Sequence, residues 1–150
     1  MTGEIGVELD EYDVVEFLKR RGMGVLGLAR DGDAYTFPIA FAYDEDTERC
    51  IFRFVMTEDS TKRSFLERTE SVSLTVYEWN GPQDWKSVVI NGTIRPVGSA
   101  DLGRAAAVFA AVGEEAALDI FNRSLSAYET VWYELEPDGI TGRGAFPSSQ

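Results

Sequence analysis

Hydrophobic and polar positions alternate along most of this chain with the period of two that is typical of half-buried β-strands. The clearest run is 71–77, where Val72, Leu74 and Val76 alternate with serine, threonine and tyrosine. Tight turns such as Asp31-Gly32-Asp33 join most of the strands, and short connections make neighbouring strands antiparallel. The other strands are predicted at 24–30, 34–43, 50–56, 85–97 and 128–135, with a short final strand after a turn at 136–139.

Fewer segments have helical spacing. Residues 10–21 carry acids early and cations late, which suits the helix dipole, and Gly22 ends that segment. The other helices are expected from Ser60 to about Arg68, over 102–112 after a Ser99 cap, and over 114–122 beyond a break at Gly113. The pattern therefore predicts a mainly β single domain over 1–150: an antiparallel barrel of six or seven strands, closed or nearly closed, with an N-terminal helix and helices between strands five and six. A ferredoxin-like sheet would need a different order of helices.

The predicted strand 34–43 has two unequal faces. Its odd positions are bulky, whereas its even positions are alanine, threonine or proline. The small face leaves room for a flat ligand close to the backbone or, equally, for a packed helix. Pro38 cannot donate a ladder hydrogen bond, so it marks an edge, a bulge or a barrel corner. Gly92, in the middle of another strand, marks a bulge or a close backbone approach.

Composition limits the classes of partner. A net charge of -12 and a pI near 4.4 describe a surface that repels nucleic acid and anionic lipid. We therefore expect neither as a partner. Such an acidic, lysine-poor surface is also typical of proteins from salt-loving organisms, in which salt screens the self-repulsion. Stabilisation by molar salt would test that halophilic interpretation.

The reactive side chains are few. Cys50 is the only cysteine and lies in a predicted strand, so we expect a small buried hydrophobe rather than a disulfide. The chain contains no histidine, which excludes histidine-based metal sites and nucleophile pairs, and we expect no metal. No leader-like or membrane-spanning apolar stretch is apparent, and we expect a cytoplasmic protein.

Two cations occupy an unusual place after the strand 50–56. Asp59 or Ser60 is a good N-cap, and Lys62 and Arg63 then fall in the first helical turn, where the dipole disfavours positive charge unless an anion is bound. Neutralisation by Glu58 and Asp59 on a solvated surface is the alternative. The chain has three lysines against eleven arginines and twenty-six acids, and this scarcity favours an anion site at Lys62. We expect Arg63 to face water.

Five segments in this order and spacing resemble the pyridoxamine 5′-phosphate oxidase-like family of FMN-binding split barrels, over about residues 9–97. The segments are Gly27-Leu28-Ala29 with Asp31-Gly32, Tyr35 to Tyr43 with Pro38, the Ser60-Thr61-Lys62 turn, Val72 to Val76, and Trp85-Lys86-Ser87-Val88 with Gly92.

The resemblance implies a split-barrel homodimer that binds one FMN in each of two clefts between the subunits. It places the flavin phosphate at Ser60, Thr61 and Lys62, with Lys62 as the cation. It brings Ser87 and Val88 to the flavin and runs the strand at Pro38, Ile39 and Ala40 past the isoalloxazine ring. Trp85 and Trp79 line the cleft or, equally, take part in packing. No catalytic residue is identified.

The sequence departs from the true oxidase in ways that argue against vitamin B6 oxidation. Thr61 replaces an arginine, another arginine is lost around Phe37-Pro38, and a lysine expected for the substrate phosphate falls near Ala42. Trp132 lacks the later arginine pattern. We therefore expect a flavoprotein oxidoreductase of undefined substrate and electron donor. The alternatives are a deazaflavin-dependent reductase of the same fold and a non-catalytic flavin-binding or sensing dimer.

Overall fold

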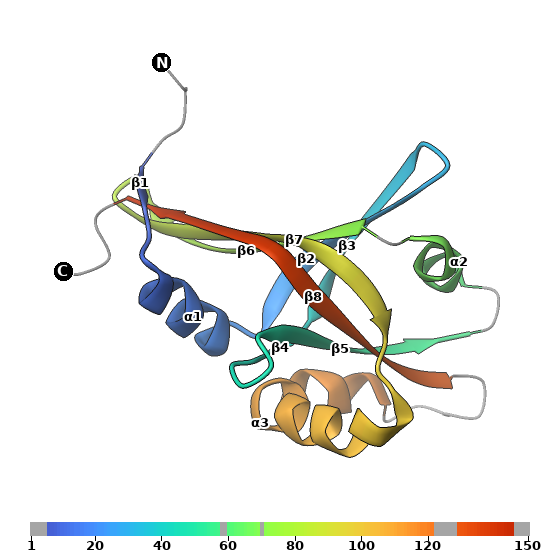
Figure 1. Ribbon diagram of the computed structural model, residues 1–150. Helices are drawn as coiled ribbons and strands as arrows, with labels where there is room; N and C mark the ends of the chain where they lie inside the picture. Colours follow the sequence, from blue (N-terminus) through green and yellow to red (C-terminus); the bar gives the residue numbers. More distant parts are fainter. Residues whose placement is uncertain (1–5, 58–59, 70, 122–128, 146–150) are drawn as a thin grey trace.

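The computed structural model describes residues 6–57, 60–69, 71–121 and 129–145. It confirms a mainly β protein: eight antiparallel strands form one sheet in the order β3-β2-β6-β7-β8-β5-β4, and β1 pairs with β8 (Figure 1). The elements are β1 (Val7–Glu8), α1 (Glu11–Arg20), β2 (Met23–Arg30), β3 (Asp33–Ala40), β4 (Ala42–Asp44), β5 (Arg49–Met56), α2 (Thr61–Arg68), β6 (Ser71–Gly81), β7 (Asp84–Pro96), a 3₁₀ turn (Ser99–Asp101), α3 (Leu102–Phe121) and β8 (Glu129–Gly144).

The sheet curls back on itself because its two edge strands are consecutive in the chain. Only Phe41 separates the end of β3 from the start of β4, and its backbone N–H donates to the carbonyl of Gly22 at 3.0 Å. Among the described residues no ladder joins β3 to β4. The barrel is therefore split along this seam, and Pro38 lies in an edge strand, as its missing N–H predicted.

The inward positions of the strands form the main core, and two helices close it. The N-terminal helix α1 contributes Val14, Phe17 and Leu18. Its N-cap is Asp10, whose carboxylate accepts from the N–H of Asp13 at 2.9 Å. The larger strand residues in this core are Leu26, Leu28, Phe37, Ile39, Phe52, Phe54, Leu74, Val76, Val88, Ile90 and Leu135. Cys50 is buried among them as expected, and burial raises the pKa of its thiol to about 12.

A second, smaller core lies between α3 and the strands β4 and β5. It contains Ala42, Ile51, Val97, Ala105 and Phe109. Figure 1 shows α3 along these two strands and α2 at a separate end of the sheet. No helix within the described ranges is long and apolar enough to cross a membrane.

Three local expectations are corrected. The turn predicted at 136–139 is wrong, because β8 continues through it with a bulge: Asn91 pairs with Gly139 and Gly92 pairs with Pro137, which leaves Asp138 as the extra residue. The structure has eight strands instead of the predicted six or seven. The short strand β1 was not predicted, and Phe41 divides the predicted strand 34–43 into β3 and β4.

The connection after β7 also differs from the prediction. Ser99 is not a helix cap, since it lies inside a 3₁₀ turn that begins after Gly98. The helix α3 continues through Gly113 instead of breaking there. A single glycine within a helix costs only about 1 kcal/mol relative to alanine, which a helix of 20 residues tolerates.

Candidate functional site

Helix α2 begins at the turn that the resemblance assigns to a flavin phosphate. The hydroxyl oxygen of Ser60 accepts a hydrogen bond from the backbone N–H of Arg63 at 3.1 Å, and Thr61 is the first helical residue. Ser60 is therefore the N-cap, and Asp59 lies outside the described residues. The first turn of α2 contains no acid. Its positive end is thus occupied by two cationic side chains, Lys62 and Arg63.

The charge of Lys62 rests on an aromatic face. Its ammonium nitrogen lies 4.7 Å from the centroid of the Phe37 ring, within the range of a cation–π interaction. Within the part of the chain that the structure describes, no carboxylate forms an ion pair with Lys62. Glu58 and Asp59, which the solvated-surface alternative requires, lie outside the described residues. The ring stabilises the ammonium group and leaves N–H donors for an anion.

A row of aromatic rings in contact with one another lies beneath this lysine. Phe37 lies 5.3 Å from Tyr35 and 6.2 Å from Phe54, measured between ring centroids. Tyr35 in turn stacks on Phe65 of α2 at 5.2 Å. Because these rings join β3, β5 and α2, they hold the first turn of the helix over β3. The position of Lys62 is therefore set by packing rather than by a surface ion pair.

The neighbours of Lys62 differ in their accessibility. Thr61 is exposed, so its hydroxyl is open to solvent. The expectation for Arg63 is wrong: its Nε donates to the carbonyl oxygen of Thr57 at 3.2 Å. That carbonyl lies just after β5, where the strand ladder has ended, and it also accepts from the backbone N–H of Ser60 at 3.3 Å. Arg63 therefore ties the start of α2 to the end of β5.

The predicted flavin-facing strand divides its residues between two sides. Pro38 is exposed on the outer face, whereas Ile39 is buried in the main core and Ala40 packs against the α3 cluster. The small outer positions Ala34 and Thr36 are exposed as well. A flat ligand can thus approach β3 from Ala34 to Pro38, while a helix covers its far end. A ligand there would meet Ile39 through the backbone alone.

The residues of β7 that were predicted to contact the flavin lie far from Lys62. The side chain of Val88 is fully buried in the core, and Ser87 is half-buried on the opposite face. Trp85 pairs with Trp79 across the β6–β7 hairpin and packs beside Gly6. Figure 1 shows this hairpin at the end of the sheet away from α2. One copy of the chain therefore brings Lys62 to β3 but not to the hairpin end of β7.

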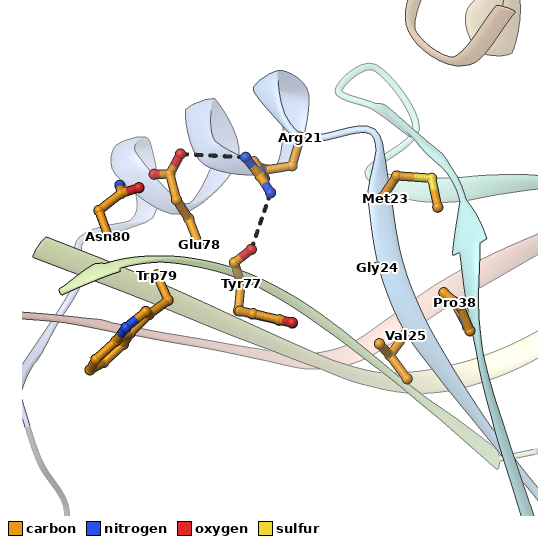
Figure 2. A pocket seen from close by; sticks show the side chains of 9 residues that line it. All are labelled: Arg21, Met23, Gly24, Val25, Pro38, Tyr77, Glu78, Trp79 and Asn80. Carbon is orange, nitrogen blue, oxygen red and sulfur yellow. Dashed lines mark hydrogen bonds and ion pairs between the residues drawn. The ribbon is translucent and has the colours of Figure 1, made fainter. Parts of the chain in front are cut away.

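A hollow of about 410 Å³ opens beside Pro38, where β2 and β6 separate. The ladder between these strands pairs Val25 with Thr75 and extends no further toward the end of β6. Figure 2 shows Arg21, at the end of α1, bridging to β6 across this opening. The residues that line it are Arg21, Met23, Gly24, Val25, Pro38, Tyr77, Glu78, Trp79 and Asn80.

The hollow has a charged rim. Arg20 donates to both carboxylate oxygens of Glu78, at 3.0 and 3.3 Å. Arg21 contacts the same carboxylate and the backbone carbonyl of Tyr77, each at 3.4 Å. The hydrogen bond from Arg20, with the charges of Arg20, Arg21 and Lys86, lowers the pKa of Glu78. The carboxylate therefore remains ionised among cations.

Sequence reasoning did not identify this hollow. The cations that end α1 were explained by the helix dipole alone, and Glu78 follows them by more than fifty positions. Tyr77 and Trp79 were recognised as aromatic residues on one strand face, and Trp79 as a candidate for the flavin cleft or for packing. The sequence did contain one signal, the pair of adjacent arginines just before a strand. Two arginines supply more positive charge than the end of a helix needs.

Comparison with known proteins places these features in a family. The family model described as pyridoxamine 5′-phosphate oxidase matches residues 10–144. None of the curated proteins matches the sequence.

Several solved structures share the fold at low sequence identity. A FAD-binding protein from Mesorhizobium loti is 19% identical with a TM-score of 0.73, and the alignment covers 95% of this chain and 98% of that one. The FAD-binding protein from Mycobacterium smegmatis is 22% identical with a TM-score of 0.68, covering 92% and 97%. The FAD- and haem-binding protein of the same organism is 18% identical with a TM-score of 0.64, covering 90% and 71%. The split barrel described above is the fold of these proteins, and from the extent of the family match the chain belongs to the pyridoxamine 5′-phosphate oxidase family.

Proposed function

We propose that this chain binds a flavin nucleotide, FMN by the family resemblance, with a phosphate at the first turn of α2. One observation carries the proposal: the ammonium group of Lys62 lies over the Phe37 ring at the positive end of a helix, with no carboxylate paired to it among the described residues. In a chain of net charge -12, such a cation is unusual. Membership of the family and neighbours described as FAD-binding proteins support a flavin as the anion.

The residues at this turn fit a phosphate group. Lys62 supplies charge, Thr61 supplies an exposed hydroxyl, and the first N–H groups of α2 lack partners within the helix. The Ser60 oxygen already accepts from Arg63, which leaves its O–H to donate. The outer face of β3 carries the exposed residues Ala34, Thr36 and Pro38, whereas Phe37 beneath Lys62 lies on the opposite, buried face. When bound, the flavin supplies the redox chemistry, and the chain supplies anchoring and orientation.

The same proposal calls for a homodimer. Ser87, Val88 and Trp85 belong to the hairpin end of β7, whereas Lys62 belongs to the opposite end of the sheet (Figure 1). Both groups can serve one cofactor only when two copies of the chain contribute to each site. We infer two equivalent flavin sites between the subunits, which sedimentation analysis of the purified protein tests.

We assign the chain to flavin-dependent oxidoreductases other than pyridoxamine phosphate oxidase. Ala42 replaces a lysine expected for the substrate phosphate, and its side chain is fully buried against α3. Trp132 packs edge-on against Phe109, with ring centroids 5.6 Å apart, and Arg53 lies 5.8 Å from its ring. These residues pack against α3 from β4, β5 and β8. They offer no phosphate clamp of the kind that vitamin B6 oxidation needs.

The decisive experiment compares cofactors and variants. Purified protein is titrated with FMN, riboflavin, FAD and a deazaflavin, and binding is followed by flavin fluorescence. Lys62→Ala should weaken FMN binding by about 1.5 to 3 kcal/mol, or roughly 10- to 150-fold, because it removes a charge-assisted contact. Riboflavin, which lacks the phosphate, should bind both proteins equally.

Lys19→Ala is the matched control, since Lys19 is an exposed lysine paired with Glu16 and Glu45. It should leave the dissociation constant of FMN unchanged. An equal affinity of wild type and Lys62→Ala for FMN removes Lys62 from the site. A chain that binds none of the four compounds contradicts the proposal as a whole, and a preference for the deazaflavin selects that class of reductase.

A non-catalytic flavin-binding dimer is the second candidate. The loss of cations at Thr61 and Phe37, relative to the true oxidase, favours it because fewer charges hold the cofactor. Reduction of the bound flavin by a nicotinamide cofactor under anaerobic conditions distinguishes the two. Bleaching of the visible flavin bands supports an oxidoreductase, whereas an unchanged spectrum supports binding or sensing.

A further inference from the structure

The hollow between β2 and β6 is lined by one cation and one anion, Arg21 and Glu78, and two further cations lie beside that anion. Arg20, Arg21 and Lys86 surround the single carboxylate of Glu78, and Lys86 lies directly opposite Glu78 in the β6–β7 ladder. Three cations therefore meet one anion, in a chain whose net charge is -12. A local excess of this sign attracts small anions, and its effect is strongest in a recess.

Among these cations, Arg21 is the one that can turn to a ligand. Its two contacts, to Glu78 and to the Tyr77 carbonyl, are both 3.4 Å long and thus at the weak end of the hydrogen-bond range. Glu78 keeps its shorter contacts with Arg20 when Arg21 leaves. The Arg21 side chain is about one-third exposed, at 34%, and Arg21 is among the residues that line the hollow. A guanidinium in this position is suited to bidentate recognition of a carboxylate.

The other side chains that line the hollow are mostly apolar or aromatic. Tyr77, Trp79 and Met23 are among the exposed large hydrophobic residues of the described chain, with 57%, 60% and 48% of their surface accessible. Figure 2 shows Tyr77 and Trp79 on β6, and Met23, Val25 and Pro38 across the opening on β2 and β3. A volume of about 410 Å³ lies within the usual range for a small-molecule site. Exposed aromatic faces beside a weakly held guanidinium suit a ligand with a flat ring and one negative group.

We propose that the hollow between β2 and β6 binds a small planar aromatic carboxylate, with its ring against Tyr77, Trp79 and Met23 and its carboxylate on Arg21. The site includes none of the residues assigned to the flavin phosphate. It shares Pro38 with the proposed flavin-facing strand, and Trp79 is also a candidate for lining the flavin cleft, so the test includes competition between the probe and FMN.

Fluorine NMR tests this site with para-fluorobenzoate as the probe and neutral para-fluorobenzamide as its matched control. The benzoate resonance should broaden and shift with added protein, and the benzamide should respond at least tenfold more weakly. Arg21→Met should reduce benzoate affinity at least tenfold while circular dichroism stays unchanged. Arg68→Met, which removes an equal charge at an exposed position far from the hollow in sequence, should bind as wild type does.

Glu78→Gln provides a second test that does not require removal of the arginine. Without its ionic competitor, Arg21 should bind benzoate more tightly, by up to roughly fivefold. A fall in affinity in Glu78→Gln overturns the inference. Equal binding of benzoate and benzamide, or displacement of benzoate by FMN at the FMN dissociation constant, overturns it as well. Failure of both probes to bind means that the hollow is closed in solution, which also rejects the site, whereas Lys62 is judged separately by its own FMN titration.

Discussion

The bulge between β7 and β8 depends on a glycine, and replacing that glycine is a sharp test of the fold. Gly92 pairs with Pro137 while Asn91 pairs with Gly139, so Asp138 is the residue in excess. At this point β8 approaches β7 more closely than a side chain allows. A Cβ atom added to Gly92 would overlap the carbonyl oxygen of Glu136. The bulge and the absent side chain therefore belong together.

The size of the effect follows from which atoms the new methyl group would meet. Besides the Glu136 oxygen, it would lie 2.9 Å from Cδ2 of Leu135 and 3.0 Å from the carbonyl carbon of Glu136. Two of these three atoms are backbone atoms of a paired strand, and they cannot move without disrupting the ladder. Overpacking a core costs about 1 to 3 kcal/mol, and a backbone collision lies at the upper end. We expect Gly92→Ala to lower the free energy of unfolding by about 3 kcal/mol.

Urea denaturation followed by tryptophan fluorescence measures this change, and the chain contains a matched control. Gly103 lies in α3, and no atom lies within 4 Å of the position that a Cβ atom would take there. Alanine at this position should raise the free energy of unfolding by about 0.5 to 1 kcal/mol. The two Gly→Ala changes are thus expected to have opposite signs. A Gly92→Ala protein with the denaturation midpoint of wild type refutes the bulge geometry.

Three further predictions concern charge and the anchor. Asp44 is buried, and its carboxylate accepts hydrogen bonds from Thr47 and Arg104. Burial alone would raise the pKa of Asp44, but these hydrogen bonds outweigh burial and lower it. Asp44→Asn should therefore lower the free energy of unfolding by about 2 kcal/mol at neutral pH. The difference from wild type should shrink below about pH 4, as the pH falls through the lowered pKa of Asp44 in the folded protein. Urea denaturation at a series of pH values measures this difference. Molar salt should raise the melting temperature if the acidic surface is adapted to salt, and a scan without any gain rejects that interpretation. Phe37→Leu should weaken FMN binding by about 0.5 to 2 kcal/mol, because it removes the ring beneath Lys62, and should leave riboflavin binding unchanged in the same fluorescence titration.

Local patterns sufficed for much of the fold. The helix α1 ends within one residue of the prediction because Asp10 caps it and charge order matches its dipole. The Asp31-Gly32 turn was predictable because both residues adopt positive φ, 47° and 87°, which asparagine-like residues and glycine favour. Alternation with a period of two identified the longer strands, since one face of each is buried in the barrel.

The errors occur where a distant strand decides the outcome. Glu136 to Gly139 has the composition of a turn, yet β7 pairs with β8 on both sides of this segment. The one extra residue of β8 forms a bulge. The short strand β1 forms only because its two residues reach β8 at the other end of the sequence. Neither pairing leaves a local signal, so the strand count and the continuity of β8 could not be predicted.

The site shows the same division between local and distant information. Lys62 was identified because its conflict with the helix dipole is local. Its partner Phe37 and the contact of Arg21 with Glu78 join residues from different elements, and only the packed barrel brings them together. The sequence pattern could therefore indicate an anion site at α2, but not the hollow beside β6.

The resemblance places a lost arginine of the true oxidase around Phe37-Pro38, and this loss changes what the proposed anion site needs when it is empty. An arginine beside Lys62 would place two like charges together at the positive end of α2, an arrangement that is stable only with an anion between them. The Phe37 ring instead stabilises a single ammonium group at 4.7 Å, and a tilted contact with the Tyr35 ring helps to hold the Phe37 ring in position. The turn is thus stable without ligand, and a phosphate adds one charge-assisted contact instead of relieving a repulsion. This is why we expect the Lys62 and Phe37 substitutions to change FMN affinity without unfolding the chain.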